Sequence, residues 1–357
     1  MTNYGLIIGP RSIKVLRTWL IATAISVVAT LIVGGATRLT ESGLSITEWR
    51  PVTGVIPPVS DESWRQAYQQ YQQIPEAQTV HAGITLSQFK ALYWWEWAHR
   101  LAGRLVGLVV LIPFLWFWRR GTIPRELFPR LALLPLLVGA QGALGWYMVS
   151  SGLAERTSVS PYRLVAHLSL ALLIFAIAVW TAAELGRSDE TGAPASPGVR
   201  RAVHGLTFAA ALTIVSGGFV AGLDAGRIFN EFPLMGGEIV PAGYGAGRGI
   251  RNWFENPIAA QFNHRWLAIL LAISIWVVWV VAERRWPVHP RRWMRLAAAV
   301  AFVQAGLGIT TLLLGAPVLV AMLHQLGAVA LLTVLLIASV DARLSGKGAV
   351  WQSGNAS

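Results

Sequence analysis

Four ionisable residues, Glu96, His99, Arg100 and Arg104, stand together at the start of a strongly apolar stretch. On a helix, Glu96, His99 and Gly103 fall at positions i, i+3 and i+7 and therefore share one face. Ionisable groups at the edge of a membrane helix are costly, which makes them functional candidates. A carboxylate in this position could move protons or stabilise a developing positive charge. What these side chains act on depends on the helices that position them.

The 357-residue chain is 54% hydrophobic and 13% charged, and its mean hydropathy is +0.53. This balance predicts an all-α integral membrane protein, because a soluble domain has no use for so many long apolar segments. The net charge of +12 could indicate nucleic-acid binding, but the basic residues border apolar segments, as the positive-inside rule predicts. We therefore expect no nucleic-acid partner. The absence of cysteine excludes disulfides, thiolate metal sites and cysteine nucleophiles.

Eight apolar segments supply the roughly 20 residues that a bilayer crossing requires. They lie at about 19–36, 94–118, 127–149, 163–184, 201–222, 264–283, 293–313 and 319–340. The first could instead be a cleaved signal peptide, but it is long for one and no A-x-A site follows it. The second is expected to begin outside the membrane, with Ser87 as its N-cap. Because the basic residues of the short connections gather on one side, both termini are predicted to be cytoplasmic.

Two connections on the predicted external side are long, at about 38–90 and 223–262. The first contains a pattern typical of an amphipathic helix, which we expect to lie across the external face as a lid. Its residues are Asp61, Glu62, Trp64, Ala67, Tyr68 and Tyr71. The second connection is rich in glycine and is expected to be irregular. On the other side, the polar segment 186–200 is predicted to be a flexible linker.

Internal similarity divides the chain into two halves of four helices. The matching pairs are Gly34-Gly35 with Gly217-Gly218, His99-Arg100 with His264-Arg265, Gln141 to Gly145 with Gln304 to Gly308, and His167 with His324. Since four spans separate equivalent helices, the halves have the same orientation and are related by an axis near the membrane normal. We therefore predict two pseudo-symmetric four-helix bundles. Residues 1–185 form the N-terminal bundle, 186–200 the cytoplasmic linker, and 201–357 the C-terminal bundle.

Four of the seven histidines occupy repeat-equivalent positions near the external ends of their spans: His99, His167, His264 and His324. The others lie in a loop, at a helix start and in an Arg/Pro-rich turn: His81, His204 and His289. A single histidine in an apolar helix is more often a hydrogen-bonded core residue, but four at similar depth favour ligands. Two imidazoles from neighbouring helices suit the axial positions of one haem iron. Zinc or iron held by side chains alone would need further carboxylates or thiolates. The pattern predicts two haems, one in each bundle.

Arginines and glycines beside these histidines fit the same prediction. Arg100, Arg104 and Arg265 lie where they could pair with haem propionates. Arg100 could equally pair with Glu96 at i+4. Small residues could let a flat macrocycle approach the backbone, or could serve only close helix packing. They are Gly103, Gly107, Gly306 and Gly308.

The two halves differ at one ionisable position. Aligning His99 with His264 places Glu96 opposite Gln261. Only the N-terminal bundle therefore keeps an acid one helical turn from its histidine, and a protein that only passes electrons between two haems has no obvious use for this asymmetry. A carboxylate beside a haem edge can stabilise positive charge or move protons during oxidation of the macrocycle. A structural salt bridge with Arg100 is the alternative.

These residues together resemble the haem A synthase family. The resemblance covers all eight spans and rests on the four repeat-placed histidines, on Glu96-x-x-His99-Arg100-x-x-Gly103-Arg104-x-x-Gly107, and on Thr37-Arg38-Leu39-Thr40-x-Ser42-Gly43-Leu44-Ser45. It implies a membrane oxidoreductase that oxidises the C8 methyl group of haem O to a formyl group, giving haem A for cytochrome c oxidase. It also implies that His99 and His167 hold haem O or haem A. By the same resemblance, His264 and His324 hold a haem B that relays electrons, and Glu96 is the catalytic acid.

Because it lacks cysteine, the chain resembles the cysteine-free subgroup of this family, which is similar to proteins of alphaproteobacteria and mitochondria. A mechanism that uses thiols of the external loop is therefore excluded. No Arg/Ser-rich transit peptide is seen, which favours a bacterial inner membrane, with the haem sites toward the periplasm. The resemblance suggests haem O synthase and oxidase assembly factors as partners. The sequence does not identify the electron acceptor or the oligomeric state.

Two other functions fit the same residues: a diheme b-type cytochrome that carries electrons from quinol, and a haem carrier or chaperone for oxidase assembly.

The chemical route by which the methyl group would be oxidised is also open. Bis-histidine ligation leaves no free iron position for O2. Either one histidine detaches, or the chemistry proceeds by electron removal and attack of water.

Overall fold

A computed structural model describes residues 10–154, 156–187, 194–286 and 288–345. Within these residues the chain is all-α, and eight helices are long and apolar enough to cross a membrane. They are α1 (Pro10–Leu39), α4 (Leu86–Arg119), α5 (Phe128–Ser150), α6 (Pro161–Leu185), α7 (Pro197–Gly222), α9 (Pro257–Arg285), α10 (Val288–Leu313) and α11 (Val318–Leu344). The predicted class, an all-α membrane protein with eight spans, is confirmed. The core of the predicted linker, 188–193, lies outside the described residues.

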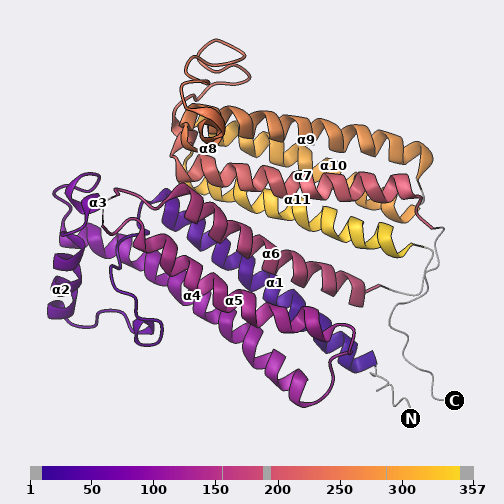
Figure 1. The fold of residues 1–357 in the computed structure, drawn as a ribbon, viewed down its shortest axis with the longest axis horizontal. Helices are drawn as coiled ribbons and strands as arrows, with labels where there is room; N and C mark the ends of the chain where they lie inside the picture. The colour runs from indigo at the N-terminus through magenta and orange to yellow at the C-terminus, as the bar shows by residue number, and fades with distance from the viewer. Residues whose placement is uncertain (1–9, 155, 188–193, 287, 346–357) are drawn as a thin grey trace.

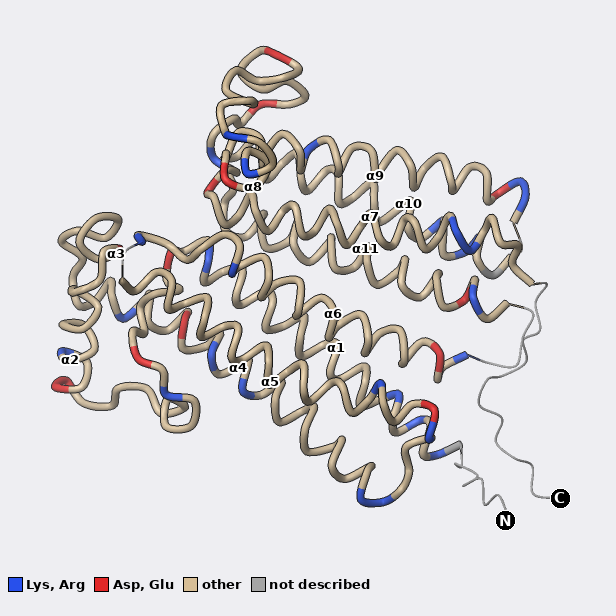
Figure 2. Tube along the Cα trace, in the orientation of Figure 1, with Lys and Arg blue, Asp and Glu red and all other residues tan. Residues whose placement is uncertain are grey.

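The eight long helices form two groups that lie side by side (Figure 1). In the first group α1 packs against α4 and α6, and α5 packs against α4 and α6. In the second group α7 packs against α9 and α11, and α10 packs against the same two helices. The groups meet where α6 packs against α7 and α11, and where α1 packs against α11. The charged residues gather toward the two ends of the helices (Figure 2), which is where a bilayer would leave them in water.

The long connections lie at one end of both groups, whereas α1 begins and α11 ends at the opposite end (Figure 1). The first connection contains α2 (Asp61–Tyr71) and α3 (Pro75–Gln78), so the predicted amphipathic helix is confirmed. Trp64 of α2 packs against Tyr93 of α4, with ring centroids 4.9 Å apart. The second connection contains the short helices η2 (Ala225–Arg227), η3 (Gly249–Arg251) and α8 (Asn252–Glu255). Which end faces the cytoplasm stays a prediction.

The helix ends differ from the sequence prediction where local capping decides them. α4 is capped by Thr85 rather than Ser87. The Thr85 hydroxyl accepts from the Gln88 backbone N–H, and the Gln88 side-chain oxygen accepts from the Thr85 backbone N–H, which is a capping box. Ser87 lies inside the first turn. His289, predicted in a turn, lies in the first turn of α10. α7 and α9 begin several residues before the predicted spans because Ser196 and Asn256 cap them.

The end of α1 carries a Schellman motif that directs the chain toward α4. Glu41 adopts a left-handed φ of 52°. The Ser42 N–H donates to the Thr37 carbonyl at 3.0 Å, and the Glu41 N–H donates to the Arg38 carbonyl at 3.2 Å. The turn is followed by Ser45, which is 2% exposed. The segment that carried part of the family resemblance therefore ends a helix and places Ser45 beside Glu96 of α4.

At the other end of the molecule a buried acid ties the two groups together. Glu184 of α6 is 7% exposed and pairs with Arg130 of α5 and with Arg343 of α11, the latter at 2.8 Å. The indole of Trp180 donates to the same carboxylate at 2.8 Å. One side chain thus joins three helices from both groups.

We expect Glu184→Ala to lower the free energy of unfolding by about 2 kcal/mol, because it leaves two arginines without their shared partner. The measurement is the apparent Tm of the purified protein in detergent. Glu283→Ala is the matched control, since Glu283 pairs with Arg295 at an exposed site, and it should change the Tm far less. Equal shifts for both variants would contradict the prediction.

Candidate functional site

The four repeat-placed histidines lie on four different helices, and each ring rests against a glycine of a neighbouring helix. The pairs are His99 of α4 on Gly34 of α1, His167 of α6 on Gly145 of α5, His264 of α9 on Gly217 of α7, and His324 of α11 on Gly308 of α10. A Cβ at these glycines would lie 2.5, 3.0, 3.0 and 2.8 Å, respectively, from the ring Cε1 atom. Only glycine lets the rings lie this close to the neighbouring helix, because any other residue would place a Cβ against the ring. We call each of these four glycines the seat of its imidazole.

Other glycines near the histidines border open space. A Cβ added at any of them would meet nothing within 4 Å, and they include Gly103, Gly107, Gly142 and Gly306. The sequence prediction grouped Gly308 with these as a contact for a macrocycle. The structure instead assigns Gly308 to the ring of His324. At Gly103, Gly107 and Gly306 no other side chain or helix lies within 4 Å of an added Cβ, so the prediction of a macrocycle contact stays open there.

Each bundle repeats a glutamine that holds the backbone of its last histidine. The Gln141 amide donates to the His167 carbonyl at 3.0 Å, and the Gln304 amide donates to the His324 carbonyl at 2.9 Å. The repeat was visible in the sequence, but its role was not, because a match between segments does not say which groups they bond. Both glutamines fix the register of two helices that carry or seat an imidazole.

The donor set of each bundle fits a haem. The described residues contain no group of three or more His, Asp or Glu side chains that could hold a metal ion by themselves. Two imidazoles per bundle would, however, suit the iron of a haem. The Nδ1 atoms of His99 and His167 are buried and have no hydrogen-bond partner among the described residues. Buried ring nitrogens without a protein partner are expected where a ligand completes the site.

Glu96 faces the first long connection and is only 2% exposed. Its Oε1 accepts from Arg100 Nε at 3.0 Å and from Arg100 Nη2 at 2.6 Å. Its Oε2 accepts from the Ser45 hydroxyl at 2.8 Å and from the Ile46 N–H at 2.6 Å. Both carboxylate oxygens are thus satisfied, and the salt bridge with Arg100 that the sequence left as an alternative is present. The acid lies one turn from His99, where the end of α1 meets α4.

The three arginines predicted to bind propionates tie the long connections to the helices. Arg100 donates to the carbonyls of Ile46 and Glu48 at 2.6 and 2.8 Å. Arg104 donates to those of Arg50 and Pro51, both at 2.9 Å. These bonds use most of their N–H groups, but Arg104 Nη1 is buried without a partner among the described residues. A propionate role for them stays a prediction.

The C-terminal bundle keeps this attachment without the acid. Arg265 donates to the carbonyls of Phe229 and Glu231 at 2.6 and 2.8 Å. Gln261, which occupies the position of Glu96, donates its amide to the same Phe229 carbonyl at 3.2 Å. An amide is therefore sufficient to anchor a connection at this position. The carboxylate differs from the amide in one contact, because its Oε1 accepts two hydrogen bonds from Arg100, whereas Gln261 makes no hydrogen bond with Arg265 among the described residues.

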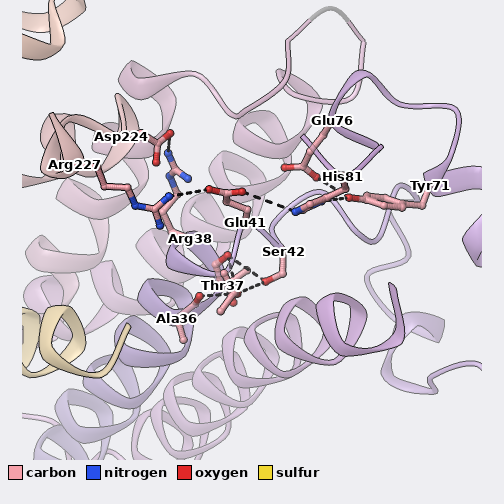
Figure 3. Close-up of polar contacts among 11 residues, drawn as sticks. Ala36, Thr37, Arg38, Glu41, Ser42, Tyr71, Glu76, His81, Asp224 and Arg227 are labelled. Atoms are coloured by element: carbon pink, nitrogen blue, oxygen red, sulfur yellow. Dashed lines mark hydrogen bonds and ion pairs between the residues drawn. The ribbon is translucent and has the colours of Figure 1, made fainter. Parts of the chain in front are cut away.

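Reciprocal ion pairs join the two bundles at the end of the molecule where α1 and α7 stop (Figure 3). Arg38 of the N-terminal bundle pairs with Asp224 at 2.5 Å, and Arg227 of the C-terminal half pairs with Glu41 at 3.3 Å. Glu41 and Asp224 occupy equivalent turns after α1 and α7, and both have a φ of 52°. Each bundle thus gives an acid to an arginine of the other. No local sequence signal indicates such pairs, because their partners are more than 180 residues apart.

His81, which the sequence marked as incidental, extends this network into the lid (Figure 3). Its Nε2 lies 3.8 Å from Glu41 and its Nδ1 lies 2.6 Å from the Tyr71 hydroxyl. The same hydroxyl donates to Glu76 at 3.3 Å. Glu76 is 5% exposed. Burial, with smaller contributions from nearby Glu96 and Glu41, raises the pKa of Glu76 to about 8, despite the hydrogen bond from Tyr71, which lowers it.

This pKa predicts a lid whose stability falls with rising pH. Between pH 4.5, the ordinary value, and about 8, the folded chain holds a proton on Glu76 that the unfolded chain releases. The stability of segment 61–84 should therefore decrease across this window and level off above it. Glu76→Gln should remove the dependence. Limited proteolysis of the lid from pH 5 to 9 measures it, with exposed Glu62→Gln as control; a Glu76→Gln profile like wild type would refute the assignment.

Comparison with known proteins places this geometry in a family. Residues 17–336 match the family model described as cytochrome oxidase assembly protein. Three relatives named haem A synthase come from Maricaulis maris, Caulobacter sp. and Hyphomonas neptunium. They are 43%, 46% and 47% identical to this chain, over 92%, 88% and 89% of its length and 96%, 92% and 90% of theirs.

The chain belongs to the haem A synthase family. Membership confirms the resemblance drawn from the four histidines and the Glu96 motif, and it confirms that the chain is a membrane oxidoreductase. The family assignment does not depend on the roles of single residues. The ligand roles of the histidines and the catalytic role of Glu96 therefore stay proposals, supported by the geometry above.

Proposed function

We propose that this chain oxidises the C8 methyl group of haem O to a formyl group and so makes haem A. The observation that carries the proposal is the acid found beside only one of two otherwise equivalent histidine pairs. Glu96 stands in the N-terminal bundle where Gln261 stands in the C-terminal bundle, and there an amide and Arg265 hold the connection without a buried acid. A charge kept at one site and absent at the other is expected where only one site performs chemistry.

In this proposal His99 and His167 hold haem O or its product, and His264 and His324 hold a resident haem B. The resident haem supplies one-electron redox chemistry between the substrate site and an external acceptor. Glu96 holds a negative charge one helical turn from His99, where it can favour the loss of electrons from the substrate and accept a proton through its contact with Ser45. Arg100 fixes the carboxylate, and the external connection above it keeps water out.

The wider assignments follow the same proposal. The N-terminal bundle, residues 1–185, is the substrate unit, and residues 201–357 form the relay unit, joined by 186–200. In this proposal the chain lies in the inner membrane of a bacterium, with the histidine ends toward the periplasm; the distribution of basic residues supports cytoplasmic termini. Haem O synthase would supply the substrate, and oxidase assembly factors would receive the product.

Mass analysis of the pigment extracted from the purified protein tests this function. The synthase predicts haem B together with haem O or haem A. Haem B alone would overturn the proposal and favour a diheme b-type cytochrome. An exchangeable haem with no modified product would instead favour a haem carrier. Haem O added to the reduced protein, with the extract followed over time, then separates a product from a co-purified pigment.

A further inference from the structure

The imidazole of His264 has a hydrogen-bond partner inside its bundle. The hydroxyl of Ser216, on α7, lies 2.8 Å from His264 Nδ1. The same hydroxyl donates its proton to the Thr213 carbonyl, one turn earlier on α7, at 2.7 Å. Ser216 precedes Gly217, on which the His264 ring rests. The side chain and the seat of the ring are therefore neighbours on one helix.

The equivalent imidazole of the N-terminal bundle lacks this partner. His99 rests on Gly34 as His264 rests on Gly217. The residue before Gly34 is Val33, whose side chain has no group that can accept a hydrogen bond. A backbone carbonyl one turn earlier lies near each ring, that of Thr30 for His99 and that of Thr213 for His264. Among the described residues, only the His264 ring also has a hydroxyl at its Nδ1. The two bundles thus share the glycine seat and differ in the residue beside it.

The direction of the serine bond decides which nitrogen can bind iron. A serine hydroxyl has one proton, and the Thr213 carbonyl, 2.7 Å away, can only accept it. In the arrangement that satisfies this carbonyl, the serine oxygen accepts from His264, and Nδ1 carries the ring proton. Nε2 then presents its lone pair for a metal. A histidine ligand is normally oriented in this way, by a hydrogen bond from its other nitrogen that also raises its basicity.

We propose that Ser216 is a positioning residue that makes His264 a permanent axial ligand, and that Val33 leaves His99 as an exchangeable one. This inference rests on the proposed function, in which each histidine pair holds a haem. It agrees with the different needs of the two sites. A relay haem must stay, whereas a substrate must enter and a product must leave. A ring without the additional hydroxyl leaves the iron at a lower cost.

Exchanging these two residues tests the proposal. Ser216→Val copies the N-terminal residue, and it should weaken haem retention in the C-terminal bundle about tenfold. It should also raise the midpoint potential of one of the two haems, because a less basic imidazole stabilises the ferric state less. Ser216→Thr, which keeps a hydroxyl, should retain the haem and show the midpoint potential of the wild-type protein. Val33→Ser should lower the potential of the other haem and slow its release.

The experiment is a redox titration of each purified full-length variant, with haem loss to apomyoglobin measured in parallel. Ser26→Ala is the matched control, because Ser26 donates to the Thr23 carbonyl with the same geometry but contacts no histidine. It should change neither property. A Ser216→Val protein whose potentials and haem loss match Ser26→Ala would overturn the inference. A wild-type protein without two haems would overturn the proposed function instead, so the two failures are distinguishable.

Discussion

A Glu96→Gln variant is expected to keep both haems and to lose haem A formation by at least about 100-fold, the contribution typical of a positioned acid or base. The amide has nearly the same shape and can still accept from the Ile46 N–H and the Ser45 hydroxyl. Gln261 shows that the equivalent connection stays attached to its arginine when an amide occupies this position. The substitution therefore removes the charge and the two bonds from Arg100, while Arg100 keeps its bonds to the Ile46 and Glu48 carbonyls.

The measurement is the rate at which haem O is converted to haem A, together with the haem content of the same preparation. Glu48→Gln is the matched control, because Glu48 lies in the same connection and its side chain pairs with exposed Arg50 rather than with Arg100. It should keep the wild-type rate. If Glu96→Gln binds both haems and makes haem A at the wild-type rate, Glu96 is a structural salt-bridge partner and the diheme cytochrome gains support.

A Gly34→Ala variant is expected to lose the haem of the N-terminal bundle and keep that of the C-terminal bundle. The added Cβ would lie 2.5 Å from His99 Cε1 and 2.9 Å from its Nδ1. Both helices are packed in the bundle, so the ring must turn away from the position in which it binds iron. Overpacking of this kind costs about 1–3 kcal/mol, which corresponds to a roughly tenfold to hundredfold loss of haem affinity.

The repeat supplies the controls for this prediction. Gly217→Ala should have the converse effect, with loss of the C-terminal haem, and a milder one, since its Cβ would lie 3.0 Å from His264. Gly205→Ala on α7 should retain both haems, because a Cβ there meets nothing within 4 Å. Haem content per protein, with the pigment identified by mass, measures all three. Retention of both haems by Gly34→Ala would show that the glycine is not a seat for the ligand.

The sequence by itself determined the elements and their repeat. Apolar segments of bilayer length predict membrane helices, because inside lipid the backbone N–H and C=O groups can form hydrogen bonds only with one another. The equivalent placement of His99 and His264, and the substitution of Glu96 by Gln261, are visible in the sequence because a repeat aligns chemistry as well as structure. The same residues carried the family resemblance, which the comparisons confirmed. Each of these features is local or depends on spacing along one chain.

Only the tertiary structure decided which groups meet. The bond from Ser45 to Glu96, the seat of His99 on Gly34 and the pair of Arg38 with Asp224 join residues that are far apart in the sequence. Each depends on how a helix is rotated about its axis and on where a connection folds back, and hydropathy constrains neither. Capping was likewise set by side-chain geometry at single residues. The sequence pattern thus identified the chemical groups of the site, and the packing of the helices determined which of them are in contact.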